Sequence, residues 1–340
     1  MVDLFCGIGG FRLAFDAAGC RCIASYDIDK FAATTYEKNH GDPVTLGDFR
    51  QVPSSEVPDF DVLAAGFPCP SFSRSGVSKR RSMGRKDGFE GESGDLFFEI
   101  VRLLRDKRPA AALIENVKHL LHHGTPRGST FQTVLDHLHE VGYRTSWVLT
   151  DAVRVVPQMR WRVFIACIRD DIDVEFDLSG VEIPDIHPRL RDILEPDPDP
   201  SLVLTDHYWN YMREYRAKHR ERGSNFGYHM PDLDGPSRAL MARYYKDGSE
   251  ILIDRGPGLN PRKLSVREAA RLMGYPDDFE FPVSKTQAYK QLGNSVVVPL
   301  VTPMAKAVVG ALDGVPTPGR SKPEVGTLRT DEMVMADIFG

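Results

Sequence analysis

The sequence predicts an α/β protein with a doubly wound, mostly parallel sheet and a second, smaller, mainly β domain. Apolar segments of strand length alternate with segments of helical period through residues 1–184, and the first apolar segment runs into a glycine-rich turn. From about Pro184 this alternation stops. We therefore divide the chain into residues 1–184 plus 285–312, a second domain with its hinge at 185–284, and a tail at 313–340 that we expect to be disordered.

The composition is that of a globular protein, so a chain of 340 residues can bury a full core. Its five cysteines form no C-x-x-C pair and no zinc-type Cys/His set, which favours a reducing cytoplasm without disulfides or metal. No signal-peptide pattern is visible, and the most apolar segment, 296–312, is interrupted by prolines and too short to span a bilayer. We expect a cytoplasmic protein without a membrane segment.

The net charge of −5 argues mildly against a nucleic-acid partner, but affinity for phosphates depends on local clusters of cations. Two such clusters occur. One is a basic helix expected at about 207–222, and the other is a loop that contains Arg74, Lys79, Arg80, Arg81, Arg85 and Lys86. Each cluster is either an ordinary solvated surface or a contact for an anionic partner.

The N-terminal segment reads as strand, glycine turn, helix and strand. The first strand ends at residue 6, the turn is Gly7-Ile8-Gly9-Gly10, and Asp27 follows the second strand. Such a unit holds an adenosine cofactor, because glycines let the backbone approach the ligand and the acid binds ribose hydroxyls. The pattern is G-x-G-G rather than G-x-G-x-x-G, and a simple tight turn is the alternative. Asp48, where a third strand would end, could reach the exocyclic amine of an adenine.

A buried strand at residues 61–65 is followed by Gly66-Phe67-Pro68-Cys69-Pro70. The prolines fix the backbone around Cys69 in an extended or turn conformation just beyond the strand, where α/β sheets place ligands. With the basic loop after it, Cys69 is predicted to be a nucleophile under a lid over an anionic substrate. A structural cysteine in a loop is the alternative.

Further along, a helix at 96–104 and a strand at 111–114 bring Glu115 to the edge of the sheet, where it is a candidate acid or a simple loop carboxylate. A helix at 131–141 and a strand at 143–149 follow. In the next segment Arg160 and Arg162 alternate with apolar residues, so at strand period both lie on one face.

In the second domain, Pro-Asp repeats at 195–200 predict a linker, and residues 243–253 predict a hairpin around the turn Lys246-Asp247-Gly248-Ser249. Ser265 and Glu268 predict a capping box at the start of a helix at 266–273. An apolar helix at 297–312 ends the ordered chain.

Six blocks occur in order from residue 2 to about 312. They are Asp3-Leu4-Phe5-x-Gly7-x-Gly9-Gly10, Gly66-Phe67-Pro68-Cys69, Glu115-Asn116-Val117, Gln158-x-Arg160-x-Arg162, Arg271-Leu272-Met273-Gly274-Tyr275-Pro276 and Gly293-Asn294-Ser295. This succession resembles the DNA (cytosine-5) methyltransferase family, and residues 242–253 look most like its bacterial Dcm-like branch. The resemblance implies a Rossmann-like S-adenosylmethionine-dependent methyltransferase fold with a mainly β target recognition domain.

The resemblance also implies site residues. Cys69 would attack carbon 6 of a flipped-out cytosine, Glu115 would hold its N3/N4 edge, Arg162 would contact O2, and Arg160 and Gln158 would order the site. The implied cofactor-binding residues are Phe5, Gly7, Gly9, Gly10, Asp27, Ile28, Asp48, Phe49, Pro68, Leu96, Asn294 and Ser295. The implied DNA-binding residues are Ser71, Ser73, Arg74, Lys79, Arg80, Arg81, Arg85, Arg238, Arg243, Tyr244, Tyr245 and Lys246.

The implied cofactor is S-adenosyl-L-methionine without a metal, and the implied partner is double-stranded DNA, bound by a monomer. The enzyme would belong to a restriction–modification system, with a separate endonuclease, or be an orphan bacterial or phage methylase; CCGG or CCWGG is a candidate recognition sequence. Three alternatives remain: a tRNA cytosine-5 methyltransferase, a non-catalytic homologue and a nicotinamide oxidoreductase. The first conflicts with the basic second domain, the second with the presence of Cys69 and Glu115, and the third leaves Cys69 unexplained.

Overall fold

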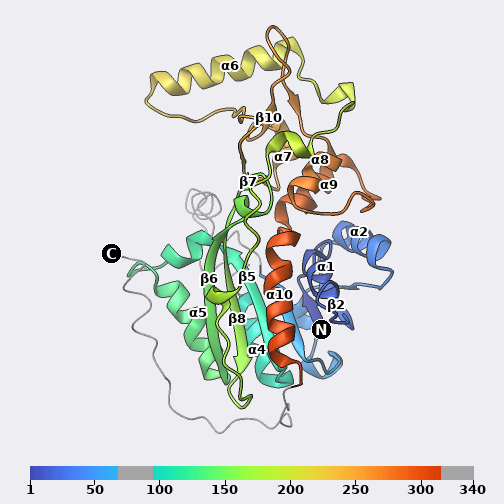
Figure 1. Ribbon diagram of the computed structural model, residues 1–340, viewed down its shortest axis with the longest axis vertical. Coiled ribbons are helices and arrows are strands. Elements are labelled where there is room, and N and C mark those ends of the chain that lie inside the picture. The colour runs from blue at the N-terminus through green and yellow to red at the C-terminus, as the bar shows by residue number, and fades with distance from the viewer. Residues whose placement is uncertain (68–94, 315–340) are drawn as a thin grey trace.

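The computed structural model describes residues 1–67 and 95–314. Its centre is a seven-stranded sheet in the order β3-β2-β1-β4-β5-β8-β6 (Figure 1). The strands are β1 (Val2–Leu4), β2 (Ala24–Asp27), β3 (Thr45–Leu46), β4 (Val62–Gly66), β5 (Ala111–Val117), β6 (Tyr143–Asp151) and β8 (Trp161–Arg169). All neighbouring pairs are parallel except those of β8, which runs antiparallel to both β5 and β6. The amino end of β8 therefore lies beside the carboxyl ends of β5 and of the parallel strands.

Helices cover both faces of the sheet. On one face lie α1 (Gly10–Asp16) and α10 (Val298–Leu312), which share a core with Ala64, Leu113 and Phe164. On the other lie α4 (Leu96–Lys107) and α5 (Ser129–Glu140), packed on a core that includes Leu63, Ile114 and Ile165. Consecutive strand residues thus enter opposite cores, as the side-chain period of a strand requires. Helix α2 (Lys30–His40) follows β2.

The α/β fold and the mostly parallel sheet are confirmed. The expected strands and helices of residues 1–184 are present with ends shifted by a few residues, and the predicted capping box of Ser265 and Glu268 begins α8 (Val266–Leu272). The expected basic helix is α6 (Asp206–Glu221), in which the side chain of Thr205 caps the amino end.

The expectation that the second domain is mainly β is wrong. Within residues 185–284 the strands are β9 (Ser237–Arg238), β10 (Leu252–Ile253) and β11 (Arg262–Lys263), each two residues long. β10 pairs antiparallel with β11, and β9 pairs with β7 (Gln158–Met159). The longest element is the 16-residue helix α6, and most of the remaining chain is irregular.

The predicted hairpin at 243–253 is also wrong. Tyr244–Asp247 forms a short helix, α7, and Gly248 closes it in the left-handed conformation with φ of 65°. An Asp-Gly pair suits a helix end as well as a hairpin turn, because in both the glycine takes a positive φ. The burial of Tyr244 favours the helix end. Its hydroxyl donates to Ile251 O and accepts from Leu264 N, and these contacts hold residues 244–247 in α7.

Helix α9 (Lys285–Asn294) was not predicted. Ser284 caps it, and it packs on α7 and α8. In the described ranges no single helix is long and apolar enough to cross a membrane; only the pair α9–α10, bent by 44°, passes that test of length and composition.

Candidate active site

A buried ion pair joins β5 and β8 at the carboxyl edge of the parallel strands. Glu115 lies near the end of β5, where it is paired in register with Gly66 of β4 and Phe164 of β8. Arg162 lies at the start of β8 opposite Val117, and its Nε is 2.7 Å from Glu115 Oε1. The Glu115 side chain is 8% exposed and the Arg162 side chain 17% exposed, so the pair is largely buried. The prediction that Glu115 lies at this edge of the sheet is confirmed.

Burial raises the pKa of Glu115 above its ordinary value, while the charges of Arg162 and Arg160 and the hydrogen bond from Arg162 oppose that rise. Desolvation is the largest of these effects, so the carboxyl group holds a proton more readily than an exposed glutamate does. A carboxyl group of this kind can donate a hydrogen bond to a ring nitrogen and accept one from an amine.

Gln158 and Arg160 are buried behind this edge and bind backbone groups of three distant segments. Arg160 donates to Leu240 O at 2.9 Å, Gly293 O at 3.0 Å and Ser295 O at 2.8 Å. Gln158 donates to Leu272 O and accepts from Leu240 N. These hydrogen bonds join the start of β8 to residues 240, 272 and 293–295.

The glycine turn after β1 has the conformation that its sequence demands. Phe5, Gly7 and Gly9 have φ values of 60°, 55° and 83°, and Gly10 begins α1. The φ of Gly9 is one that other residues rarely adopt, and a Cβ there would also come within 2.1 Å of His40 Nε2, so another residue would strain the turn. Asp27 accepts from Gly7 N at 2.8 Å and from Asp29 N at 2.7 Å.

Two of the other predicted cofactor residues lie near this turn: the Phe49 ring lies beside that of Phe5, and Ser295 lies close to Gly10. Ile28 is 71% exposed, a large apolar side chain open to solvent directly after Asp27. Asp48 caps a 3-10 turn and pairs with Arg50, Phe49 is buried against Tyr26, and Leu96 begins α4. Asn294 is exposed at the end of α9, and the Ser295 hydroxyl is hydrogen-bonded to that of Tyr275.

These residues fit S-adenosyl-L-methionine. A glycine-rich backbone turn, an acid at the end of β2 and an exposed apolar residue beside it suit the adenosine part of this cofactor. Among the described residues no cluster of three or more His, Cys, Asp or Glu side chains could hold a metal ion.

Several predicted residues lie outside the described ranges, so their geometry is not given. They are Pro68, Cys69, Ser71, Ser73, Arg74, Lys79, Arg80, Arg81 and Arg85. Of the other predicted DNA contacts, Arg238, Arg243 and Lys246 are exposed and Tyr245 is half-buried. The expectation that Tyr244 contacts DNA is wrong, because its side chain is fully buried and its hydroxyl is occupied by backbone partners.

Sequence reasoning missed three supporting side chains. Asn116 Nδ2 donates to Phe67 O at 3.1 Å, which holds the last described residue before Cys69 against the end of β5. Asp151 accepts from the backbone N–H of Arg160 at 2.7 Å, and His40 packs against the glycine turn. Asn116 is part of the block Glu115-Asn116-Val117, so that block could have indicated it. The contacts of Asp151 and His40 join residues that are distant in the sequence, so no local pattern predicts them.

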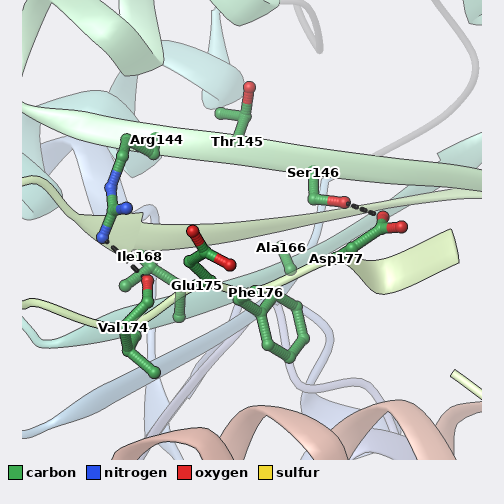
Figure 2. Close-up of a pocket in the computed structure, with 9 residues that line it drawn as sticks. All are labelled: Arg144, Thr145, Ser146, Ala166, Ile168, Val174, Glu175, Phe176 and Asp177. Carbon is green, nitrogen blue, oxygen red and sulfur yellow. Dashed lines mark hydrogen bonds between the residues drawn. The ribbon is translucent and has the colours of Figure 1, made fainter. Parts of the chain in front are cut away.

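A cavity of about 520 Å³ lies elsewhere, at the start of β6 and the end of β8 (Figure 2). It is lined by residues that include Arg144, Ser146 and Asp177, and Asp177 accepts a hydrogen bond from Ser146 at 2.9 Å. These strand ends are opposite to those that carry Arg162 and Glu115, so this cavity is separate from the ion pair.

Comparisons with known proteins agree with this geometry. The family model described as C-5 cytosine-specific DNA methylase matches residues 1–310. The chain is 41% identical to "Type II methyltransferase M.NlaX" of Neisseria lactamica, covering 93% of this chain and 97% of that protein. It is 38% identical to the "DNA-cytosine methyltransferase" of Escherichia coli strain K12, covering 90% and 76% respectively.

Among solved structures, the S. pombe Dnmt2 methyltransferase superposes with a TM-score of 0.71, covering 92% of this chain and 98% of that one. At 19% identity this likeness supports the fold alone. The family model and the curated relatives span nearly the whole described chain, including the ion pair and the glycine turn. The chain is therefore a member of the C-5 cytosine-specific DNA methylase family and a DNA (cytosine-5)-methyltransferase.

Proposed function

We propose that this enzyme transfers a methyl group from S-adenosyl-L-methionine to carbon 5 of a cytosine flipped out of a short, specific duplex sequence, through a covalent bond between Cys69 and carbon 6. The buried Glu115–Arg162 pair carries the proposal. It lies at the sheet edge where the chain leads through Phe67 towards Cys69, and Asn116, next to Glu115, holds Phe67 there.

The chemical problem is that carbon 5 of cytosine is a weak nucleophile. In the proposed mechanism the Cys69 thiolate forms a bond to carbon 6, and the ring electrons move to carbon 5 and towards N3. Glu115 shares its proton with N3 and accepts from the N4 amine, and Arg162 donates to O2. The two side chains thereby stabilise the charge that develops in the ring.

When bound, S-adenosyl-L-methionine would supply an electrophilic methyl group to carbon 5; its methyl–sulfur bond would break and S-adenosyl-L-homocysteine would be left. A water molecule then removes the carbon 5 proton, the bond between carbon 6 and sulfur breaks, and Cys69 leaves as a thiolate. The glycine turn and Asp27 would hold the nucleoside, Ile28 would pack on the adenine, and Asn294 and Ser295 would close the same pocket.

The proposed division of the chain has residues 1–184 and 285–312 in catalysis and 185–284 in target recognition. The exposed Arg238, Arg243 and Lys246 are proposed DNA contacts, together with the cations of residues 74–86. The relatives named type II methyltransferases support a role in a restriction–modification system. The proposal adds that the endonuclease is a separate protein and that the methylase acts as a monomer.

Bisulfite sequencing of DNA from cells that express the protein tests the proposal. We expect 5-methylcytosine in one short sequence context with the wild type and none with Cys69→Ser, which should still bind S-adenosyl-L-methionine in calorimetry. Turnover by Cys69→Ser, or the absence of 5-methylcytosine in cells that express folded wild-type protein, would overturn it.

A further inference from the structure

Helix α6 has an exposed edge that combines aromatic rings with cations. Tyr208, Tyr211, Tyr215 and His219 follow one another at helical spacing, with ring centroids 6.2, 6.0 and 4.6 Å apart, and Phe226 completes the row 5.2 Å from His219. Tyr211 and Phe226 are each 55% exposed and Tyr215 is 38% exposed. We call this row the aromatic edge of α6.

The opposite side anchors the helix. Met212 is buried with Leu204 and Leu252, and Trp209 packs on Tyr228 at 4.6 Å. Arg216 lies over the Tyr228 ring at 4.5 Å. Tyr208 also packs on this cluster. Since these contacts hold the helix, packing does not explain the exposed rings of Tyr211, Tyr215 and Phe226.

Cations line the same helix without carboxylate partners. Residues 206–222 contain five arginines and lysines but three carboxylates, whereas the whole chain has a net charge of −5. Lys218 and Arg222 follow Tyr211 by seven and eleven residues, so all three lie on one side of the helix. Within the described ranges none of the five cations forms an ion pair, whereas Arg189 and Arg271, also in the second domain, do so.

Cations without ion-pair partners in the described residues, placed beside exposed tyrosines, suit the sugar–phosphate backbone of a nucleic acid. Lys and Arg bind phosphates and Tyr hydroxyls donate to phosphate oxygens, and such contacts position a protein on a duplex without reading its sequence. A helix of 16 residues is about 24 Å long, so it can reach several backbone phosphates of one duplex.

We propose that the aromatic edge of α6, with Lys218 and Arg222, binds the sugar–phosphate backbone of the substrate duplex independently of sequence. In Figure 1, α6 extends across the top of the molecule from the β10–α7 region towards the side of β6 and α5, beyond the sheet edge that carries Glu115. It could therefore hold DNA on the far side of that edge. The proposal rests on the proposed function only in that the polyanion is substrate DNA.

The test measures DNA affinity by fluorescence anisotropy over a range of salt concentrations. One labelled duplex carries the mapped methylation site and a second, of equal length, has that site scrambled. Lys218→Gln/Arg222→Gln should bind both duplexes about tenfold more weakly, and the slope of log affinity against log salt should fall by about 1.8, or 0.9 per lost phosphate contact. Lys306→Gln, an exposed lysine on α10, is the matched control and should change neither quantity.

The tyrosines are tested separately. Tyr211→Ala/Tyr215→Ala should weaken binding to both duplexes. Tyr211→Phe/Tyr215→Phe should restore only the part that comes from contact of the rings with sugars, because it lacks the hydroxyl groups that donate to phosphates. Circular dichroism and the affinity for S-adenosyl-L-methionine should stay at wild-type values in all variants, which separates this result from unfolding. Wild-type methylation is measured in parallel, because its absence would contradict the proposed function and not this inference.

Three results would overturn the proposal. The charge variant could match Lys306→Gln in affinity and salt slope. It could lose affinity for the site-carrying duplex alone, which would make α6 a reader of bases. Light scattering could show a wild-type dimer that Tyr211→Ala/Tyr215→Ala dissociates, which would make the edge a protein interface.

Discussion

Arg162 of β8 and Glu115 of β5 meet across an antiparallel strand pair, with Arg162 Nε 2.7 Å from Glu115 Oε1. The antiparallel direction of β8 is what makes this contact possible. A parallel strand in the same place would put its amino end at the opposite edge of the sheet, away from the carboxyl end of β5. The one reversed strand thus brings a cation to the edge where parallel strands place ligands.

Glu115→Gln should lower kcat by about 10²–10⁴-fold, because an amide can neither supply the proton nor carry the charge that the mechanism requires. Affinity for S-adenosyl-L-methionine should be unchanged. Radiolabelled methyl transfer and calorimetry measure the two quantities. Glu99→Gln is the control, since Glu99 pairs with Arg102 on α4. A kcat within tenfold of wild type would contradict the role of Glu115.

Arg160→Lys should destabilise the fold by about 3 kcal/mol, because one ammonium group cannot replace the guanidinium donors that bind three carbonyl groups. Urea unfolding gives the free energy of unfolding. The exposed Arg255, whose hydrogen bond to Asn260 O is 3.4 Å long, provides the control Arg255→Lys, which should have little effect. Equal stability of the two variants would show that these carbonyl contacts contribute nothing.

Gly293→Ala should destabilise the protein by about 1–3 kcal/mol or more, because a Cβ there would lie 2.2 Å from Ala242 N and 2.4 Å from Met241 C. These are backbone atoms, so α9 or residues 241–242 must move. Gly310→Ala in α10 is the matched control. No atom lies within 4 Å of its added Cβ, and it should raise stability by about 0.5–1 kcal/mol. Thermal unfolding of both variants tests the contrast, which would fail if they shifted Tm in the same direction.

Asp3→Asn should become increasingly stabilising as pH rises. Burial, followed by the charge of Asp27, raises the pKa of Asp3 to about 8, and neither of its carboxyl oxygens has a hydrogen-bond partner in the described residues. The folded state therefore holds a proton that the unfolded state loses near pH 4, and wild-type stability falls as pH rises from about 4 to about 8.

Asparagine does not titrate, so the difference in Tm between Asp3→Asn and wild type should grow in favour of the variant between pH 5 and pH 8. Asp278→Asn removes an exposed carboxylate and should show no such trend. A pH-independent difference for Asp3→Asn would contradict a proton bound at Asp3.

The sequence alone determined the order of strands and helices in the first 184 residues and the position of Glu115 near a strand end. These follow from local patterns, namely the apolar period and the glycines at turns. The six blocks also identified the family, because their residue types and order are themselves sequence properties. Strand order and direction then brought Glu115 and Arg162 together.

Only the tertiary structure decided the rest. Asp247-Gly248 fits a hairpin or a helix end, and it became a helix end because Tyr244 is buried between Ile251 and Leu264. In the sequence, Arg160 and Arg162 alternate with apolar residues, which indicates a strand face. The carbonyl groups to which Arg160 donates lie 80, 133 and 135 residues away, and the sequence pattern does not indicate them. Backbone carbonyls carry no side-chain signature in a sequence, so contacts to them become visible only when packing brings the segments together.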